Sequence, residues 1–269
     1  MTSDSKLTLD FIKHQQQSMH LDALYMPRNL PLDMASYRPC SASIVSADGV
    51  RESKQLSYDD AGRLVKQETR SFVRSGSLAG MPRNTTRVLQ VTYDDRHLIQ
   101  SVIDGDFVTT YTYDASGAIE RTQGKPPKPS VVTPARSSVF TLDDATRTIS
   151  SRTMAGNVPE SGASSERYVF DQKGRLISAD GLRVVSGKWA YTTSPDQTQQ
   201  VEHVQGSVTI THTLKDGRVI RSVKKDPANG VVLTETLYSY TDGKLTQVTV
   251  TDKPANKIQT TLTYKHTCS

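Results

Sequence analysis

The chain is poor in the residues from which catalytic and metal sites are usually built. Its 269 residues include two cysteines, six histidines and one tryptophan. No histidines stand at the spacing of metal ligands, and neither cysteine lies close enough to a histidine pair to complete a zinc set. A nucleophile elbow, a phosphate-binding glycine loop and a His-Glu-x-x-His sequence are all absent. These absences predict a protein that is not an enzyme and that binds no metal or other cofactor.

Long hydrophobic runs and concentrated charge are also missing. No stretch is apolar for long enough to span a bilayer, and the first residues lack the charged start, continuous apolar core and cleavage site of a signal peptide. The formal net charge of +5 is small, and the basic residues are not interleaved with stacking aromatics. The sequence therefore predicts no membrane span and argues against a nucleic-acid partner.

Alternating segments rich in Thr, Val and Tyr fill most of the chain. Examples are "LQVTY" at 89–93, "FVTTYTY" at 107–113 and "VTITHTL" at 208–214. Because successive side chains of a strand point to opposite faces, a period of two is typical of a half-buried β-strand. The fold class predicted from this pattern is all-β.

One turn recurs between these segments, as "YDDAGRL" at 58–64, "YDASGAI" at 113–119, "FDQKGRL" at 170–176, "LKDGRVI" at 214–220 and "YTDGKLT" at 240–246. The aspartate can accept backbone N–H groups at the start of a type I turn, and the glycine can take the left-handed position that closes it. In the two shorter copies, the Asp-Gly pair suits a two-residue hairpin. The predicted structural turn residues are Asp59, Gly62, Asp114, Gly117, Asp171, Gly174, Gly217 and Gly243.

Strand and turn alternate to give repeated antiparallel hairpins, which predict an open, curved and twisted β-sheet. We expect an N-terminal arm or short helix in residues 1–40, stopped by prolines, and a sheet domain in residues 41–269. About 16 strands at ~4.8 Å would form a ribbon ~77 Å wide, which rolls into a cylinder too narrow to enclose a domain. The sheet is therefore expected to offer a surface to a partner and not to enclose one.

The pattern Tyr-x-Tyr-Asp-x-x-Gly-Arg-Leu, seen in "YTYDASGAI", "YVFDQKGRL" and "YSYTDGKL", resembles the YD repeat of the Rhs family, which teneurins and the shell-forming components of insecticidal toxin complexes share. The resemblance covers about residues 50–265 and implies a continuous ribbon of hairpins. Large members form a cocoon around a toxin domain released by self-cleavage. Here "DPANG" at 226–230 departs from the cleavage signature and predicts a hairpin turn. The chain thus resembles a short, open member without the self-cleaving core or toxin domain.

From these features we expect a non-enzymatic protein-binding module. By analogy with the setting of the family, it would suit an immunity protein that neutralises a secreted bacterial toxin or effector by occlusion. A cell-surface or carbohydrate-binding structural module and an enzyme with an unrecognised site are the alternatives. Basic side chains steer encounters toward acidic proteins, although the expected role of any single one of them is that of a solvated turn residue. The candidate partner-binding residues are Arg63, Arg175, Arg218, Arg221, Lys224, Lys225 and Lys244.

The two cysteines flank the repeats. Cys40 precedes the first repeat, and Cys268 is the penultimate residue. A disulfide between them would tie the ends together and constrain the unfolded chain by about 4 to 5 kcal/mol. Such a bond persists in an oxidising compartment, which favours a periplasmic or secreted location. Two unrelated thiols in a cytoplasmic protein are the alternative.

If Cys40 and Cys268 are bonded, the oxidised protein will show no free thiol under native or denaturing conditions. Reduction will then lower the melting temperature, because the unfolded chain regains the freedom that the bond removes. Thiol titration followed by thermal denaturation with and without reductant checks both. Two thiols titrating in the oxidised protein would contradict the bond and the location inferred from it.

Overall fold

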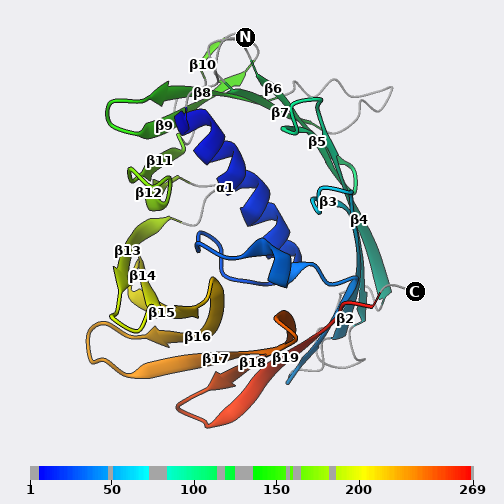
Figure 1. Ribbon diagram of the computed structural model, residues 1–269. Helices are drawn as coiled ribbons and strands as arrows, with labels where there is room; N and C mark the ends of the chain where they lie inside the picture. Colours follow the sequence, from blue (N-terminus) through cyan, green and yellow to red (C-terminus); the bar gives the residue numbers. More distant parts are fainter. Residues whose placement is uncertain are drawn as a thin grey trace. The chain divides into compact units, whose positions relative to one another are not determined.

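A computed structural model describes residues 6–47, 51–72, 84–113, 119–124, 136–155, 158–159, 165–181 and 186–267. Apart from the first 40 residues, the described chain consists almost entirely of antiparallel strands joined by short turns (Figure 1). The predicted fold class is confirmed, including the short N-terminal helix. The elements are α1 (Lys6–Ala23), η1 (Met34–Tyr37), β1 (Ser41–Ser46), β2 (Arg51–Tyr58), β3 (Leu64–Phe72), β4 (Asn84–Tyr93), β5 (Ile99–Asp104), β6 (Phe107–Tyr113), β7 (Ile119–Gly124), β8 (Arg136–Asp143), β9 (Thr148–Ala155), β10 (Val158–Pro159), β11 (Arg167–Phe170), β12 (Leu176–Asp180), β13 (Gly187–Thr193), β14 (Gln199–Gln205), β15 (Val208–Lys215), β16 (Arg218–Lys225), β17 (Val232–Thr241), β18 (Lys244–Asp252) and β19 (Lys257–Lys265).

The chain divides into two compact units. Unit 1 comprises Met1–His20 and Leu89–Lys188, and unit 2 comprises Leu21–Val88 and Trp189–Ser269. Each unit thus combines part of the N-terminal 40 residues with a run of hairpins.

In unit 1, helix α1 supplies apolar side chains to the face of the hairpins. The ring of Phe11 lies 5.3 Å from that of Phe140 on β8 and 5.1 Å from that of Tyr168 on β11. All three rings are buried. Beside them, Asp10 accepts a hydrogen bond of 2.5 Å from the Arg147 guanidinium, so the helix is held to the strands by both apolar and ionic contacts.

In unit 2, the first strand of the repeats lies between the second and the last. Strand β1 pairs with β2 on one side and with β19 on the other, in a register that sets Ile44 opposite both Glu52 and Leu262. Strand β1 therefore has a hydrogen-bonding partner on both sides. This pairing satisfies backbone groups that would otherwise invite association with another chain.

The segment between α1 and β1 is hydrogen-bonded to the strands of unit 2. Tyr264 donates to the Leu24 carbonyl at 2.7 Å, and the Asp33 amide donates to the Gly217 carbonyl at 2.7 Å. Tyr37 is fully buried and accepts from the Val219 amide at 3.0 Å. The N-terminal segment is therefore an integral part of the unit-2 core.

The recurring turn has the geometry that its residues predict. Asp59 Oδ1 accepts from the Arg63 amide at 2.8 Å, and Asp171 Oδ1 accepts from the Arg175 amide at 2.9 Å. Gly62 and Gly174 have φ values of 74° and 77°. The shorter copies place Asp216-Gly217 and Asp242-Gly243 at positive φ throughout, as a two-residue hairpin requires.

"DPANG" forms the turn between β16 and β17, in which the Gly230 amide donates to the Asp226 carbonyl at 2.8 Å. Asp114 and Gly117 lie outside the described residues.

Two of these glycines also allow the N-terminal residues to approach the turn. A Cβ at Gly174 would lie 2.6 Å from Asp10 Oδ1, and a Cβ at Gly62 would lie 2.1 Å from Arg38 Nη1. The turn glycines thus satisfy two constraints at once, the left-handed backbone and the close contact.

Replacing Gly174 by alanine will destabilise unit 1 more than the same change at Gly105. Both glycines have positive φ, so both variants lose on the order of 1 kcal/mol from backbone strain. Only Gly174 faces Asp10, whereas nothing lies within 4 Å of the Cβ position at Gly105. We expect Gly174→Ala to cost about 1 to 3 kcal/mol more, because displacing Asp10 weakens its bond to Arg147. Urea denaturation of both variants measures the difference, and equal midpoints would contradict the close approach.

Candidate functional site

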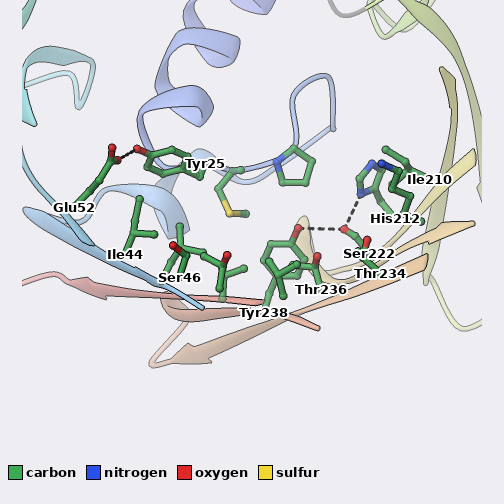
Figure 2. A pocket seen from close by; sticks show the side chains of 17 residues that line it. Tyr25, Ile44, Ser46, Glu52, Ile210, His212, Ser222, Thr234, Thr236 and Tyr238 are labelled. Carbon is green, nitrogen blue, oxygen red and sulfur yellow. Dashed lines mark hydrogen bonds between the residues drawn. The ribbon is translucent and has the colours of Figure 1, made fainter. Parts of the chain in front are cut away.

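A cavity of about 590 Å³ lies within unit 2, on the face of the strands that carries the N-terminal segment (Figure 2). Strands β15 to β19, β1 and β2 supply its floor, and Tyr25, Met26 and Pro27 cover it. This volume is within the range of ~300 to 1,000 Å³ that is typical of small-molecule sites.

The floor consists of two rows of side chains that run across neighbouring strands. In each row, every residue is the register partner of the next, so the row continues from the hairpins near the C-terminus onto β1 and β2. Residues on the same face of adjacent strands lie about 5 Å apart, and the rows therefore form a continuous surface. The first row is Ser222, Thr236, Val250, Thr260 and Ser46, and the second is Tyr238, Val248, Leu262, Ile44 and Glu52.

One end of the cavity carries a chain of three buried polar side chains. His212 Nδ1 and Ser222 Oγ lie 2.7 Å apart, and Ser222 Oγ lies 3.1 Å from Tyr238 Oη (Figure 2). Burial, with a smaller contribution from His203, lowers the pKa of His212 to about 4. The imidazole is consequently neutral at physiological pH.

The opposite end carries a carboxylate that already has partners. Glu52 accepts hydrogen bonds from Tyr25 Oη and, at 2.8 Å, from Ser71 Oγ. Next to it, the Lys54 ammonium lies 3.5 Å from the centre of the Tyr25 ring and donates to the Ala23 carbonyl at 2.9 Å. Burial lowers the pKa of Lys54 to about 8.

The serine–histidine pair differs in an important respect from a hydrolytic site. Within the described part of the chain, no carboxylate is recorded on the ring of His212, and Ser222 shares its hydroxyl with Tyr238. Nucleophilic catalysis also requires a group that orients the base. Among the described residues, no group of three His, Cys, Asp or Glu side chains could hold a metal ion. The arrangement is suited to binding an apolar body that has a polar end.

Three of the predicted partner-binding arginines are engaged within the chain. Arg63 and Arg175 each bond the aspartate of their own turn at 2.7 Å. Arg218 Nε donates to Ser36 Oγ at 3.2 Å. These guanidiniums hold turns and the N-terminal segment, and they are less available to a partner than their position in the sequence suggested.

Strand alternation separates the remaining basic cluster. Arg221 bonds Glu235 at 2.6 Å on the face of the sheet that points away from the cavity, whereas Lys224 lines the cavity. Lys225 and Lys244 are exposed at the ends of their strands. The structure does not bring Arg221 and Lys224 to one surface, although they are three residues apart.

No protein-family model and no curated protein matches the chain. Among solved structures, the chain is similar to a porin-like protein from Bacteroides uniformis, with 14% identity over 89% of this chain and 99% of that one and a TM-score of 0.43. It is also similar to TcdB2–TccC3 without its hypervariable C-terminal region, with 13% identity over 77% of this chain, 12% of that one and a TM-score of 0.32. The Photorhabdus luminescens Tc holotoxin pore has 11% identity over 77% and 17% of the two chains and a TM-score of 0.19. At these identities and TM-scores the function must be inferred from the side chains of this protein.

None of the described helices combines the length and apolarity needed to cross a membrane.

The buried neutral His212 predicts a specific loss of stability in acid. Its pKa is about 4 in the folded state and ~6.5 in the unfolded chain, so the unfolded state takes up the proton first as the pH falls. The contribution of the neutral His212 to the free energy of unfolding is fully present above about pH 6.5. About 3 kcal/mol of that free energy is lost as the pH falls to 4.

Unfolding free energies at about pH 7 and pH 4.5 test this prediction. His212→Asn will lose less stability than the wild type between the two pH values, whatever its stability at neutral pH. His97→Asn changes an exposed histidine at φ 67°, where asparagine is tolerated, and will follow the wild type. An equal loss of unfolding free energy in the wild type and in His212→Asn between the two pH values would rule out the neutral buried imidazole.

Proposed function

We propose that the chain is a short YD-repeat-like protein that binds a folded protein partner without catalysing a reaction. The contact surface is the outer face of unit 2, defined as the side of β16 to β19, β1 and β2 that points away from the cavity. The observation that carries the proposal is a set of exposed aliphatic side chains on this face.

The aliphatic side chains lie within a regular cross-strand arrangement. Leu237 and Val45 are 48% and 50% exposed, and Ile258 on β19 is 56% exposed. Leu237 and Val45 belong to one row, in which each residue is the register partner of the next. Exposed aliphatic groups rimmed by polar residues are characteristic of protein interaction sites. The row is Arg221, Leu237, Thr249, Thr261, Val45 and Arg51.

The charges of the outer face favour an acidic partner. Arg221 and Lys253 share the single carboxylate of Glu235, at 2.6 and 3.0 Å. Their hydrogen bonds lower the pKa of Glu235, so this group of three side chains keeps a net positive charge. Arg51, at the other end of the row, is also exposed. Positive groups at both ends of this row increase the rate of encounter with negative surfaces.

A role as an immunity protein that blocks a secreted toxin by occlusion fits a binding protein of this kind. A periplasmic or secreted location is part of the same proposal. It is supported by the position of Cys40, whose amide donates to the Lys265 carbonyl at 2.8 Å, three residues before Cys268. Cys268 itself lies outside the described residues, and the disulfide stays a prediction. A carbohydrate-binding module has less support, because among the described tyrosines only Tyr25 is largely exposed.

The proposal is tested by Leu237→Asp, which places a carboxylate at the centre of the row. Affinity purification from cells or culture fluid of the source organism, followed by quantitative mass spectrometry, will recover a stoichiometric protein with the wild type and not with the variant. Val231→Asp alters an equally exposed aliphatic residue (47%) in the β16–β17 turn and will retain the partner. With the purified partner, Arg221→Glu will slow association and weaken its salt dependence.

Two results would overturn the proposal. The first is recovery of the same stoichiometric protein by wild type and Leu237→Asp alike. The second is the absence of any stoichiometric protein together with retention on a glycan array, which would favour the carbohydrate-binding module.

A further inference from the structure

We propose that the cavity of unit 2 is a binding site for an elongated amphipathic carboxylate, such as a medium- or long-chain fatty acid, with its carboxylate at Lys224. This site lies on the opposite face of the sheet from the proposed protein-binding surface and is independent of it.

The second floor row is apolar in the middle of the cavity. Val248, Leu262 and Ile44 are neighbours in the second floor row and are at most 8% exposed. Met26 and Pro27 cover them from the N-terminal segment. These groups offer an apolar ligand a lining on two sides, which is the usual environment of a small-molecule site.

The cavity is elongated, and its charged groups lie at its ends. Lys224 lies on β16 and Glu52 on β2, five strands further along the floor. At ~4.8 Å for each strand, this corresponds to a path of about 24 Å along the sheet. Figure 2 shows Glu52 and Tyr25 together at one end and His212, Ser222 and Thr234 at the other. A long, thin ligand matches this outline better than a compact one.

The chemistry of the Lys224 end selects an anion. Lys224 is the one cationic side chain among the residues that line the cavity. In the described part of the chain, no carboxylate lies within ion-pair distance of it. Its register partner Thr234 supplies a hydroxyl donor. A carboxylate here would receive one charge-assisted hydrogen bond and one or more neutral ones.

The Glu52 end fixes the orientation of the ligand. The Glu52 carboxylate is already hydrogen-bonded to Tyr25 and Ser71, and Lys54 beside it offsets its charge, so this end gives a second anion less attraction than Lys224 does. A cationic amphiphile would place its ammonium against Lys224 or compete with those partners. A neutral lipid would leave Lys224 without an anion. The monocarboxylate is therefore the class that satisfies both ends.

Calorimetric titration of the purified, delipidated full chain tests the proposal, with dodecanoate, methyl dodecanoate and dodecylamine as probes below their aggregation concentrations. Dodecanoate will bind with a stoichiometry of one. The methyl ester will bind about ten- to a hundredfold more weakly, because it lacks the charge-assisted hydrogen bond. The amine will bind no better than the ester.

Two variants locate the site. Lys224→Met will bind the acid and the ester with similar affinity, whereas Lys225→Met, an exposed neighbour, will keep the preference for the acid. Val250→Trp fills the apolar floor and will weaken both ligands, and its melting curve shows whether the fold is retained.

Several outcomes would overturn the proposal. They are no binding of any probe, equal affinities of the wild type for acid and ester, tighter binding of the amine, and an unchanged preference in Lys224→Met. Because Lys224→Met and Val250→Trp alter residues that line the cavity, such failures would not affect the protein-binding proposal.

Discussion

Unit 2 depends on one constraint, the pairing of β1 between β2 and β19. This register brings Ile44 beside Leu262 and Ser46 beside Thr260, and so it carries both floor rows of the cavity across from the last hairpins onto the first. The same register continues the outer row from Thr261 to Val45. The cavity and the proposed protein-binding surface are thus the two faces of a single set of strand pairings, because side chains alternate along every strand.

The N-terminal segment depends on that sheet and in turn completes it. Buried and half-buried tyrosines provide the contacts. Tyr264 donates to the Leu24 carbonyl. The hydroxyls of Tyr37 and Tyr240 lie 2.7 Å apart, and Tyr240 also donates to the Val219 carbonyl at 2.7 Å. Burial raises the pKa of each of these phenols, so each remains a neutral hydrogen-bonding group. An apolar ring with a polar tip suits a boundary between a sheet and an irregular segment, whose backbone groups need partners.

The tyrosines and arginines of the repeat therefore have mainly internal roles in the described residues. Arg63 and Arg175 were predicted to face a partner, yet each closes its own turn by bonding Asp59 or Asp171. Part of the positive charge that the sequence assigned to a docking surface is used within the hairpins. Arg51, Arg221 and Lys253 carry positive charge on the outer face of unit 2, and the predicted Lys225 and Lys244 are also exposed.

Local sequence patterns predict the strands, the turns and the N-terminal helix, because these depend on residues a few positions apart. Asp171 and Gly174, for example, carry the whole geometry of their turn. Only the tertiary structure decided which strands meet, since Leu24 and Tyr264 are 240 residues apart and no local pattern records that contact. The cavity could not be predicted for the same reason, because its floor joins Ser222 to Ser46 through register. Strand alternation then set Lys224 and Arg221 on opposite faces, because a shift of one residue reverses the direction of a side chain.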